Sequence, residues 1–236
     1  MIDYPLLTGD WTTPGGHPVR FFYRDGTNDW NTLSSTMAPH DEYHLPRGLA
    51  GAALDVGAYL GSVAVGLALD NPGLRVFAIE PVPDNIALIR RNLDANGVAD
   101  RVHLIEGAVG DGSTVEVWYR YRGTSAIEHH AFVGNSSLAY DHGGEHEHET
   151  AVYTSLSLDS LVDRFGRFDW VKIDCEGGEF AFLDSPAVAD LAYIIGEWHS
   201  VRGHTRADLR ALLDATHDLR FDRDDDSTGG FAAVRR

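Results

Sequence analysis

The segment LDVGAYLG at Leu54–Gly61 decides the fold of this chain. The apolar residues that lead into it predict a buried strand, while Gly57 and Gly61 permit a tight turn and close approach of the backbone to a ligand. The residues that follow, LGSVAVGLALD at 60–70, predict a buried helix that ends before a proline. This stretch is long enough to imitate a membrane span, but its glycines and Asp55 argue against one.

The same alternation of strand and helix continues along the chain. Strands are predicted at 53–56, 75–80, 102–109, 168–174, 191–199, 217–223 and 229–236. Helices are predicted at 60–70, 83–97 and 205–216, and the second ends at Gly97 in a left-handed cap. The pattern indicates an α/β fold with a Rossmann-like, doubly wound and mostly parallel seven-stranded sheet, edged by an antiparallel C-terminal hairpin.

Length and composition narrow the classes of function. A chain of 236 residues with 43% hydrophobic content suits one domain, residues 1–236. Its 36 acidic and 19 basic residues give a net charge of -17, which disfavours nucleic acid and anionic membranes as partners and favours a small neutral or cationic molecule. The single cysteine, Cys175, excludes an intramolecular disulfide and is compatible with a reducing compartment. The first twenty residues show no secretory pattern, so a cytoplasmic location is expected. Oligomeric state is left open by the sequence, and a homo-oligomer is one of the alternatives.

The ends of the first two strands predict a nucleoside ligand. Ligands of doubly wound sheets bind beyond the carboxyl ends of the strands. Glu80 ends the second strand, where a carboxylate can accept hydrogen bonds from both hydroxyls of a ribose. The glycines before it have the spacing G-x-x-x-G rather than the G-x-G-x-x-G of dinucleotide folds. This spacing disfavours a nicotinamide or flavin cofactor.

Four blocks of sequence carry a resemblance to a known family. They are LDVGAYLG at 54–61, VFAIEPVPDNIALIRRNLDANG at 76–97, SLSLDSL at 155–161 and DWVKIDCEGGEF at 169–180. In this order and spacing they resemble the FkbM-type methyltransferases, and RDGTND at 24–29 with DEY at 41–43 resemble the N-terminal elements of that family. The resemblance implies a class I methyltransferase fold, S-adenosylmethionine as cofactor, and a cap or lid formed by residues 1–50.

The resemblance also implies which residues surround the cofactor. Asp55, Gly57 and Gly61 are expected around its methionine part, and Glu80 at its ribose. The adenine is expected against residues 106–109, which include Glu106, Ala108 and Val109.

Two tyrosines complete the expected cofactor site. The resemblance implies that Tyr43 covers the cofactor. Tyr59 departs from the family pattern, because many members carry asparagine there, although its ring can still line the site. Both tyrosines could instead pack with their hydroxyl groups at the surface.

Three ionisable residues at the ends of the fourth and fifth strands are candidates for catalysis. Asp174 ends the fourth strand, and Glu197 and His199, two residues apart on the fifth, point to the same side. We interpret them as an acid/base cluster in which His199 or Asp174 takes a proton and Glu197 orients the imidazole or a substrate hydroxyl. Two alternatives stay open, a Mg²⁺ or Mn²⁺ site and purely structural hydrogen bonding.

Two further features bear on the site. Lys172, the only lysine of the chain, is expected to pair with a carboxylate because buried ammonium groups need such a partner. The insertion at 118–153 between the third and fourth strands is expected to form part of the acceptor pocket, with aromatic residues Trp118, Tyr119, Tyr121 and Phe132.

These observations predict an S-adenosylmethionine-dependent O-methyltransferase that acts on a hydroxyl of a small metabolite. The resemblance suggests a sugar, a glycoside or a polyketide-type natural product as acceptor, and in-line transfer of the methyl group needs a general base. One alternative is a non-catalytic subunit that binds the cofactor or a partner without turnover. The other is a nicotinamide-dependent oxidoreductase.

Overall fold

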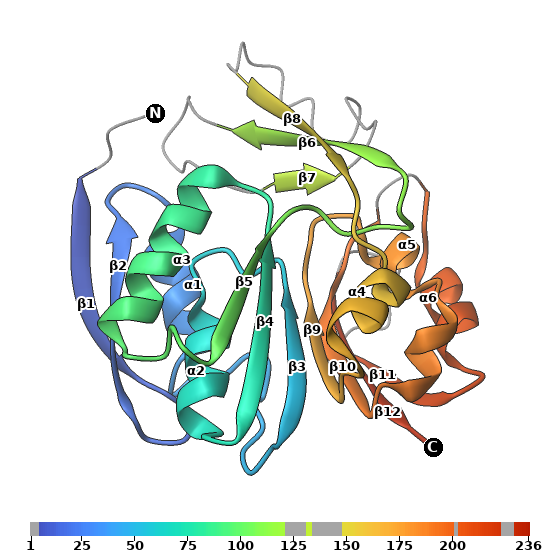
Figure 1. Cartoon of the computed structure of the whole chain (residues 1–236), viewed down its shortest axis with the longest axis horizontal. Helices are drawn as coiled ribbons and strands as arrows, with labels where there is room; N and C mark the ends of the chain where they lie inside the picture. Colours follow the sequence, from blue (N-terminus) through green and yellow to red (C-terminus); the bar gives the residue numbers. More distant parts are fainter. Residues whose placement is uncertain (1–4, 121–130, 134–147, 201–202, 223–228) are drawn as a thin grey trace.

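A computed structural model describes residues 5–120, 131–133, 148–200, 203–222 and 229–236, and its centre is a seven-stranded sheet (Figure 1). The strands are β3 (Gly51–Val56), β4 (Leu74–Glu80), β5 (Val102–Glu106), β9 (Trp170–Ile173), β10 (Tyr193–Trp198), β11 (His217–Phe221) and β12 (Gly229–Arg235). They lie in the order β11-β12-β10-β9-β3-β4-β5, and of these seven only β12 runs against the others. The predicted mostly parallel sheet with an antiparallel C-terminal hairpin is therefore confirmed.

The order of the strands reverses beside β3. The chain adds β4 and β5 on one side of β3 and later returns to add β9 and β10 on the other. In a doubly wound sheet such a reversal separates the loops at the carboxyl ends of the strands and leaves a crevice for a ligand. The ends of β3, β4, β9 and β10 are therefore where a site is expected.

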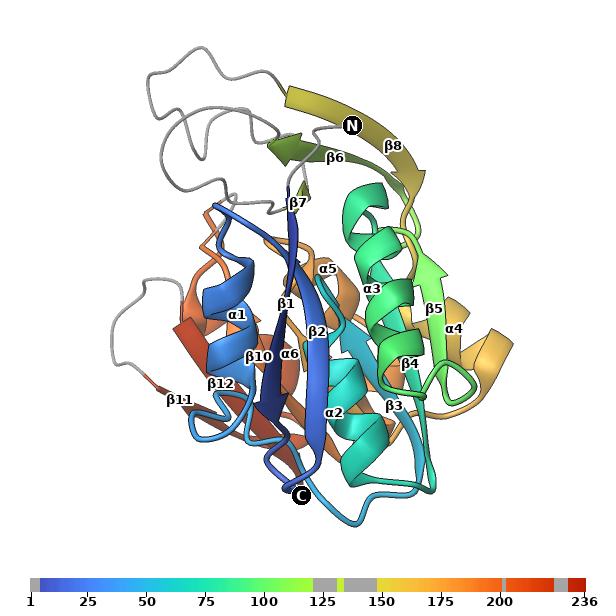
Figure 2. The same cartoon turned by 90° about the vertical axis from the view of Figure 1, so that its left-hand side faces the viewer.

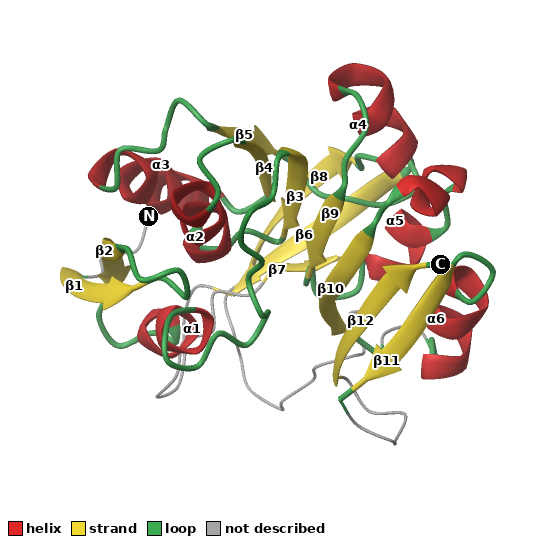
Figure 3. Ribbon diagram, turned by 90° about the horizontal axis from the view of Figure 1, so that it is seen from below, coloured by secondary structure: helices red, strands yellow, loops and turns green. Residues whose placement is uncertain are grey.

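Helices cover both faces of the sheet (Figures 1 and 3). One face carries α1 (Asp29–Thr36), α2 (Ser62–Asp70) and α3 (Pro83–Ala95). The other carries α4 (Leu158–Phe165), α5 (Glu179–Leu183), the 3₁₀ helix η1 (Pro186–Asp190) and α6 (Arg206–Leu213). Because side chains alternate along a strand, Ala53 packs into the first core and its neighbour Leu54 into the second.

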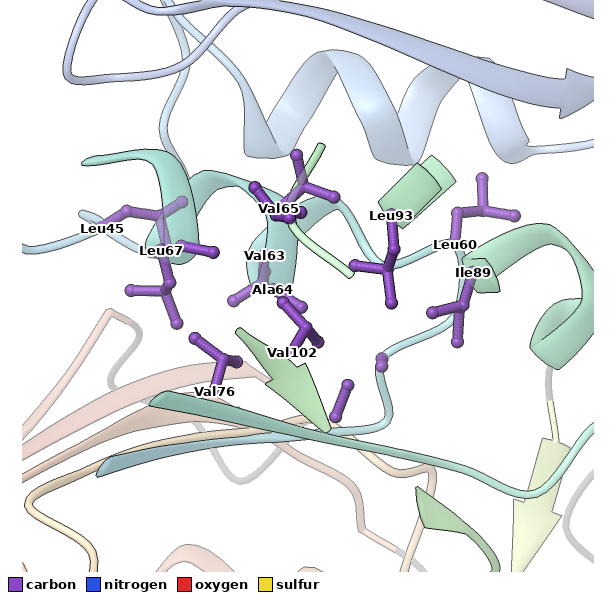
Figure 4. Packing of buried hydrophobic residues seen from close by; sticks show 14 of the residues in the cluster. Leu45, Leu60, Val63, Ala64, Val65, Leu67, Val76, Ile89, Leu93 and Val102 are labelled. Atoms are coloured by element: carbon purple, nitrogen blue, oxygen red, sulfur yellow. The ribbon is translucent and has the colours of Figure 1, made fainter. Parts of the chain in front are cut away.

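Helix α2 is apolar around most of its circumference, and other parts of the molecule surround it. Every residue from Ser62 to Ala68 is buried. Figure 4 shows its Leu67 in one cluster with Leu45 from the N-terminal segment, Val76 of β4 and Ile89 of α3. Among the helices of the described ranges, α2 included, none has both the length and the apolar character needed to cross a membrane.

Helix α3 ends as its sequence predicts. Gly97 adopts a φ of 63°, and the N–H of Val98 donates to the carbonyl of Leu93 at 3.1 Å. This bond closes the last turn in the manner of a glycine cap, which explains why the helix ends at Ala95.

The N-terminal residues form a hairpin of β1 (Leu6–Thr12) and β2 (Pro18–Arg24), and β2 runs alongside α3 (Figure 2). Asn92 of α3 accepts a hydrogen bond from the N–H of Phe22 at 2.7 Å and donates one to the carbonyl of Leu60 at 2.9 Å. One buried amide therefore joins the hairpin, the helix and the glycine turn. Closure of residues 1–50 as a lid stays a prediction.

The insertion forms a small antiparallel sheet in the order β7-β6-β8. Its strands are β6 (Thr114–Arg120), β7 (Ala131–Val133) and β8 (His148–Thr154). The hydroxyl of Tyr153 donates to the carbonyl of Pro81 at 2.7 Å, which ties the base of this sheet to the end of β4. The four aromatic residues expected in the acceptor pocket lie outside the part of the chain whose side chains are described, so that role stays a prediction: Trp118, Tyr119, Tyr121 and Phe132.

Candidate active site

A cavity of about 330 Å³ lies at the carboxyl ends of β3, β4, β9 and β10. Segments far apart in the sequence form its walls. They are α1 with Glu42 and Tyr43, the glycine turn with the start of α2, the ends of β4 and β5, and residues 172–176 with Glu197. The reversal of strand order therefore produces a ligand-sized space where the sheet predicts one.

Crowding makes Gly57 necessary at the base of this cavity. Its φ is 74°, and a Cβ there would lie 1.8 Å from the carbonyl oxygen of Asp174. Any other residue would force the ends of β3 and β9 apart. Gly61, with a φ of 79°, is the N-cap residue just before α2 and does not line the cavity, whereas the nearby Tyr59 and Ser62 do.

Asp55 does not line the cavity either, although the resemblance places it around the methionine part of the cofactor. It is fully buried, and its Oδ2 accepts a hydrogen bond from the N–H of Ala64 at 3.0 Å. Burial raises the pKa of Asp55, and the charge of Lys172 opposes this rise. The carboxylate therefore holds the first turn of α2 from behind the glycine turn.

Lys172 supports the glycine turn from below. Its Nζ donates to the carbonyl of Gly57 at 2.7 Å and lies 3.6 Å from the carboxylate of Asp55, so the predicted pairing with a carboxylate is present. Burial alone would lower the pKa of Lys172, but the charges of Asp55 and Asp174 outweigh it and raise the pKa. The lysine is therefore a fixed positive charge at the wall of the cavity.

Glu80 lines the cavity at the end of β4, and three donors hold its carboxylate. Oε2 accepts from the N–H of Tyr59 at 2.9 Å. Oε1 accepts from the N–H of Val82 at 3.0 Å and from Nδ2 of Asn85 at 3.1 Å. Burial raises the pKa of Glu80, although these bonds favour its ionised form. A carboxylate held in one orientation suits recognition of the two hydroxyls of a ribose.

Asn85 is a candidate residue that sequence reasoning missed. Its side chain lines the cavity, and its Oδ1 is buried with no hydrogen-bond partner among the described residues. An unsatisfied buried acceptor costs about 1–3 kcal/mol, which a hydroxyl or amino group of a ligand would recover. The orphaned oxygen beside Glu80 therefore fits an adenosine-containing cofactor. Its position in the first turn of the helix after the acidic strand end is the signal that could have found it.

The residues after β5 divide into two groups. Ala108 and Val109 line the cavity, and the N–H of Leu156 donates to the carbonyl of Ala108 at 2.8 Å. Glu106 lies apart from them, because its exposed side chain forms an ion pair with Arg90. Of the expected adenine segment, residues 107–109 therefore line the cavity and Glu106 does not.

The two tyrosines line the cavity with their hydroxyl groups bonded to carboxylates. The hydroxyl of Tyr43 donates to Oδ2 of Asp174 at 2.8 Å, and that of Tyr59 donates to Oδ1 of Asp29 at 2.5 Å. Burial raises the pKa of both tyrosines well above the ordinary value. Both side chains therefore connect the N-terminal segment to the strand ends.

The three candidate catalytic residues lie together. One donor atom from each of Asp174, Glu197 and His199 lies within 4.8 Å of the others. Gly196 makes this possible, because a Cβ there would lie 1.7 Å from the carbonyl oxygen of Ile173. Without a side chain at that position, β10 approaches β9 closely enough to bring the two strand ends together.

The surroundings of His199 differ from those that the sequence predicts. Its Nδ1 donates to Glu179 at 2.9 Å, and its Nε2 lies 3.2 Å from Glu176 and 3.9 Å from Asp174. Burial alone would lower the pKa of His199, but the bond to Glu179 and the neighbouring charges raise it to about 10. The imidazole is therefore protonated at neutral pH and unsuited to act as the base. Glu179, not Glu197, orients it.

Glu179 is a second residue that sequence reasoning missed. Its carboxylate is fully buried and accepts hydrogen bonds from the N–H groups of Cys175 at 3.1 Å and Gly177 at 3.0 Å. It therefore shapes the turn after β9 while it holds His199. The sequence signal is the second acid of EGGE, at the start of α5.

Two carboxyl groups near His199, those of Glu197 and Glu176, have raised pKa values. Burial and the charge of Asp174 raise the pKa of Glu197. Burial raises the pKa of Glu176 to about 8, despite the attraction of His199. The cluster therefore carries more acids than its one imidazolium can neutralise. The Mg²⁺ or Mn²⁺ alternative stays open, because Nε2 of His199 could become a ligand on loss of its proton while Glu179 keeps Nδ1.

Solved structures share this fold. The precorrin-6y C5,15-methyltransferase of Geobacter metallireducens superposes with a TM-score of 0.50 at 14% identity, covering 91% of this chain and 93% of that chain. Together with the glycine turn and the buried acid at the end of β4, this likeness identifies the fold as that of the class I methyltransferases.

Sequence comparison assigns the family within that class. The model described as "Methyltransferase FkbM domain" matches residues 55–222, and the chain belongs to this family. A "Probable O-methyltransferase" of Mycobacterium tuberculosis is 31% identical over 113 residues, 48% of this chain and 42% of that protein. The release factor glutamine methyltransferase of Chlorobaculum tepidum is 45% identical over 53 residues, 22% of this chain and 18% of that protein. The chain thus spans less than half the length of these curated relatives. Its cofactor is S-adenosylmethionine, and the nicotinamide alternative is set aside.

Proposed function

We propose that this chain transfers the methyl group of S-adenosylmethionine to a hydroxyl of a small metabolite, such as a sugar, a glycoside or a polyketide-type natural product, in the cytoplasm. The observation that carries the proposal is the position of Glu197. It lines both the cofactor cavity and a second cavity of about 330 Å³. A hydroxyl acceptor in the second cavity would meet a carboxylate that can remove its proton as the new bond forms.

The residues of the first cavity have separate roles in this proposal. S-adenosylmethionine, when bound, supplies an electrophilic methyl group. Glu80 and Asn85 would hold the ribose, the turn at Gly57 would surround the methionine part, and Ala108 and Val109 would pack against the adenine. These contacts would direct the methyl group toward the ends of β9 and β10.

We assign the general base to Glu197 rather than to His199. The bonds and charges that hold the proton on His199 leave the imidazolium to stabilise the neighbouring carboxylates. Asp174 is held by the hydroxyl of Tyr43 and lines only the first of the two cavities. The raised pKa of Glu197 makes this carboxylate a stronger base than an exposed glutamate.

The second cavity supports an acceptor with several polar groups. Gly230 and Ala232 of β12 supply small residues on its sheet side. Arg220 and Asp222, from the C-terminal part of the chain, and Glu42, from the N-terminal part, also line this cavity. The guanidinium of Arg220 and the carboxylates of Glu42 and Asp222 would recognise hydroxyl groups, and the excess of acids would exclude an anionic acceptor.

The test is methyl transfer to a panel of hydroxylated acceptors. Purified protein is incubated with S-adenosylmethionine labelled in its methyl group and with sugars, glycosides and macrolactones, and NMR locates the label. A methyl ether is expected with wild-type protein and with Asp163→Asn, an exposed position on α4, but not with Glu197→Gln. A methyl group on carbon or nitrogen contradicts O-methylation. Cofactor binding without turnover across the panel favours a non-catalytic subunit, and loss of activity with a chelator favours the metal alternative.

A further inference from the structure

We propose that Tyr59 is a positioning residue that couples the N-terminal segment to the carboxylate of Glu80, so that helix α1 and Glu80 respond to the cofactor as one unit. The two ends of this residue make different contacts. Its backbone N–H donates to Oε2 of Glu80 at 2.9 Å, and its hydroxyl donates to Oδ1 of Asp29 at 2.5 Å. The inference rests on the cofactor and not on the proposed acceptor.

Asp29 is a firm anchor for the hydroxyl. It is the first residue of α1, is fully buried, and accepts two side-chain hydrogen bonds from Arg24 at 2.8 and 2.9 Å. Burial alone would raise the pKa of Asp29, but the bonds and charge of Arg24 outweigh burial and lower it. The guanidinium also lies 5.6 Å from the centre of the Tyr59 ring. The tyrosine is therefore held by an ionised pair that belongs to the N-terminal segment.

The backbone of Tyr59 needs such a hold. Its φ is 53°, a left-handed conformation that is strained for a bulky residue by about 1–3 kcal/mol. In this conformation the N–H points at Glu80. If the hydroxyl lost Asp29, the turn could relax and Glu80 would lose one of its three donors.

Helix α1 completes the connection. Its Thr32 and Ser35, together with the preceding Asn28, line the same cavity as the glycine turn. A ligand that binds Glu80 should therefore stabilise α1 through Tyr59 as well as through direct contact. Movement of α1 away from the cavity should likewise weaken the binding of a ribose by Glu80.

The experiment measures binding of S-adenosylhomocysteine by calorimetry in a double-mutant cycle. Tyr59→Phe removes only the hydroxyl and should weaken binding about tenfold. In a Glu80→Ala background the same change should matter less than about twofold, because its route to the ribose has been removed. Tyr23→Phe, on β2 and away from the cavity, is the matched control and should bind like wild type.

Hydrogen exchange supplies a second readout. The ligand should slow exchange in α1 of the wild type and slow it much less in Tyr59→Phe. A merely structural role would lower the melting temperature of the ligand-free protein and leave both the affinity and this protection unchanged.

Two results would overturn the proposal. One is a Tyr59→Phe affinity within about twofold of wild type, and the other is an equal loss with and without Glu80. Should Tyr59→Phe fold poorly, Tyr59→Leu replaces it in the cycle, because leucine also lacks the hydroxyl and, unlike asparagine, has no amide that could contact the cofactor. It should also weaken binding about tenfold, and an unchanged affinity in this variant overturns the proposal equally.

Discussion

Glu80 shows how a single carboxylate can be prepared for a ligand. Its three donors fix both oxygens before any ribose arrives. Glu80→Ala should therefore weaken binding of S-adenosylhomocysteine by about 1–3 kcal/mol, measured by calorimetry. Glu106→Ala is the control, since this side chain is exposed and paired with Arg90, and its affinity should not change. Unchanged binding in Glu80→Ala would contradict the assignment of Glu80 to the ribose. Weaker binding in Glu106→Ala would show that Glu106 takes part in binding the cofactor.

Kinetic measurements can decide whether Glu197 or Asp174 is the general base. Glu197→Gln should lower turnover by about 10² or more while cofactor affinity stays near that of wild type, because only the transition state loses its base. The base must be ionised, so activity should rise with pH through the raised pKa of Glu197, above the ordinary value of 4.5. Initial rates across pH provide the measurement. Full turnover in Glu197→Gln together with lost turnover in Asp174→Asn would move the role of base to Asp174.

At the scale of elements, the contact between β9 and β10 depends on an absent side chain. A Cβ on Gly196 would lie 1.7 Å from the carbonyl of Ile173, so Gly196→Ala should destabilise the protein by about 1–3 kcal/mol or more. Gly73→Ala is a matched control, since its Cβ would meet only Ala50 at 4.0 Å. Urea denaturation measures both, and equal stability of the two variants would show that the strands separate without penalty.

The elements also show why part of the site could be predicted. Strand ends are visible in the apolar pattern, so Glu80, Asp174 and Glu197 were found. Asp55 and Glu106 were expected at the cofactor from the family resemblance, but neither lines the cavity. The carboxylate of Asp55 binds the N–H of Ala64, and that of Glu106 pairs with Arg90 at the surface.

Partners that come from other elements escaped prediction for a different reason. Asn85 and Glu179 lie on helices whose approach to the strand ends is set by packing between elements. The strand pattern carries no information on that approach. The protonated state of His199 escaped prediction for the same reason, since it depends on acids gathered from two elements and a turn.

The molecule as a whole should lose stability on the alkaline side. Folding raises the pKa of His199 from 6.5 to about 10, so its contribution is complete below 6.5 and is lost as the pH rises through 10. Glu176, raised from 4.5 to about 8, acts in the same direction at lower pH. The free energy of unfolding, measured with urea, should therefore fall from pH 6.5 to 10. In His199→Gln this free energy should fall less steeply in the upper part of that pH range. A level or rising free energy across this range would contradict the charge assigned to the imidazole.

The position of β12 has a practical consequence for anyone who trims this protein. The family match covers residues 55–222, yet β12 at Gly229–Arg235 lies inside the sheet, between β10 and β11. A fragment cut at the limits of the match would leave β10 with an open edge and β11 with no neighbour, which invites aggregation. It would also lack α1 and Tyr43, and with them one wall of the cofactor cavity. Expression of the shortened piece should yield insoluble material, and a soluble fragment should need both the N-terminal residues that line the cavity and β12.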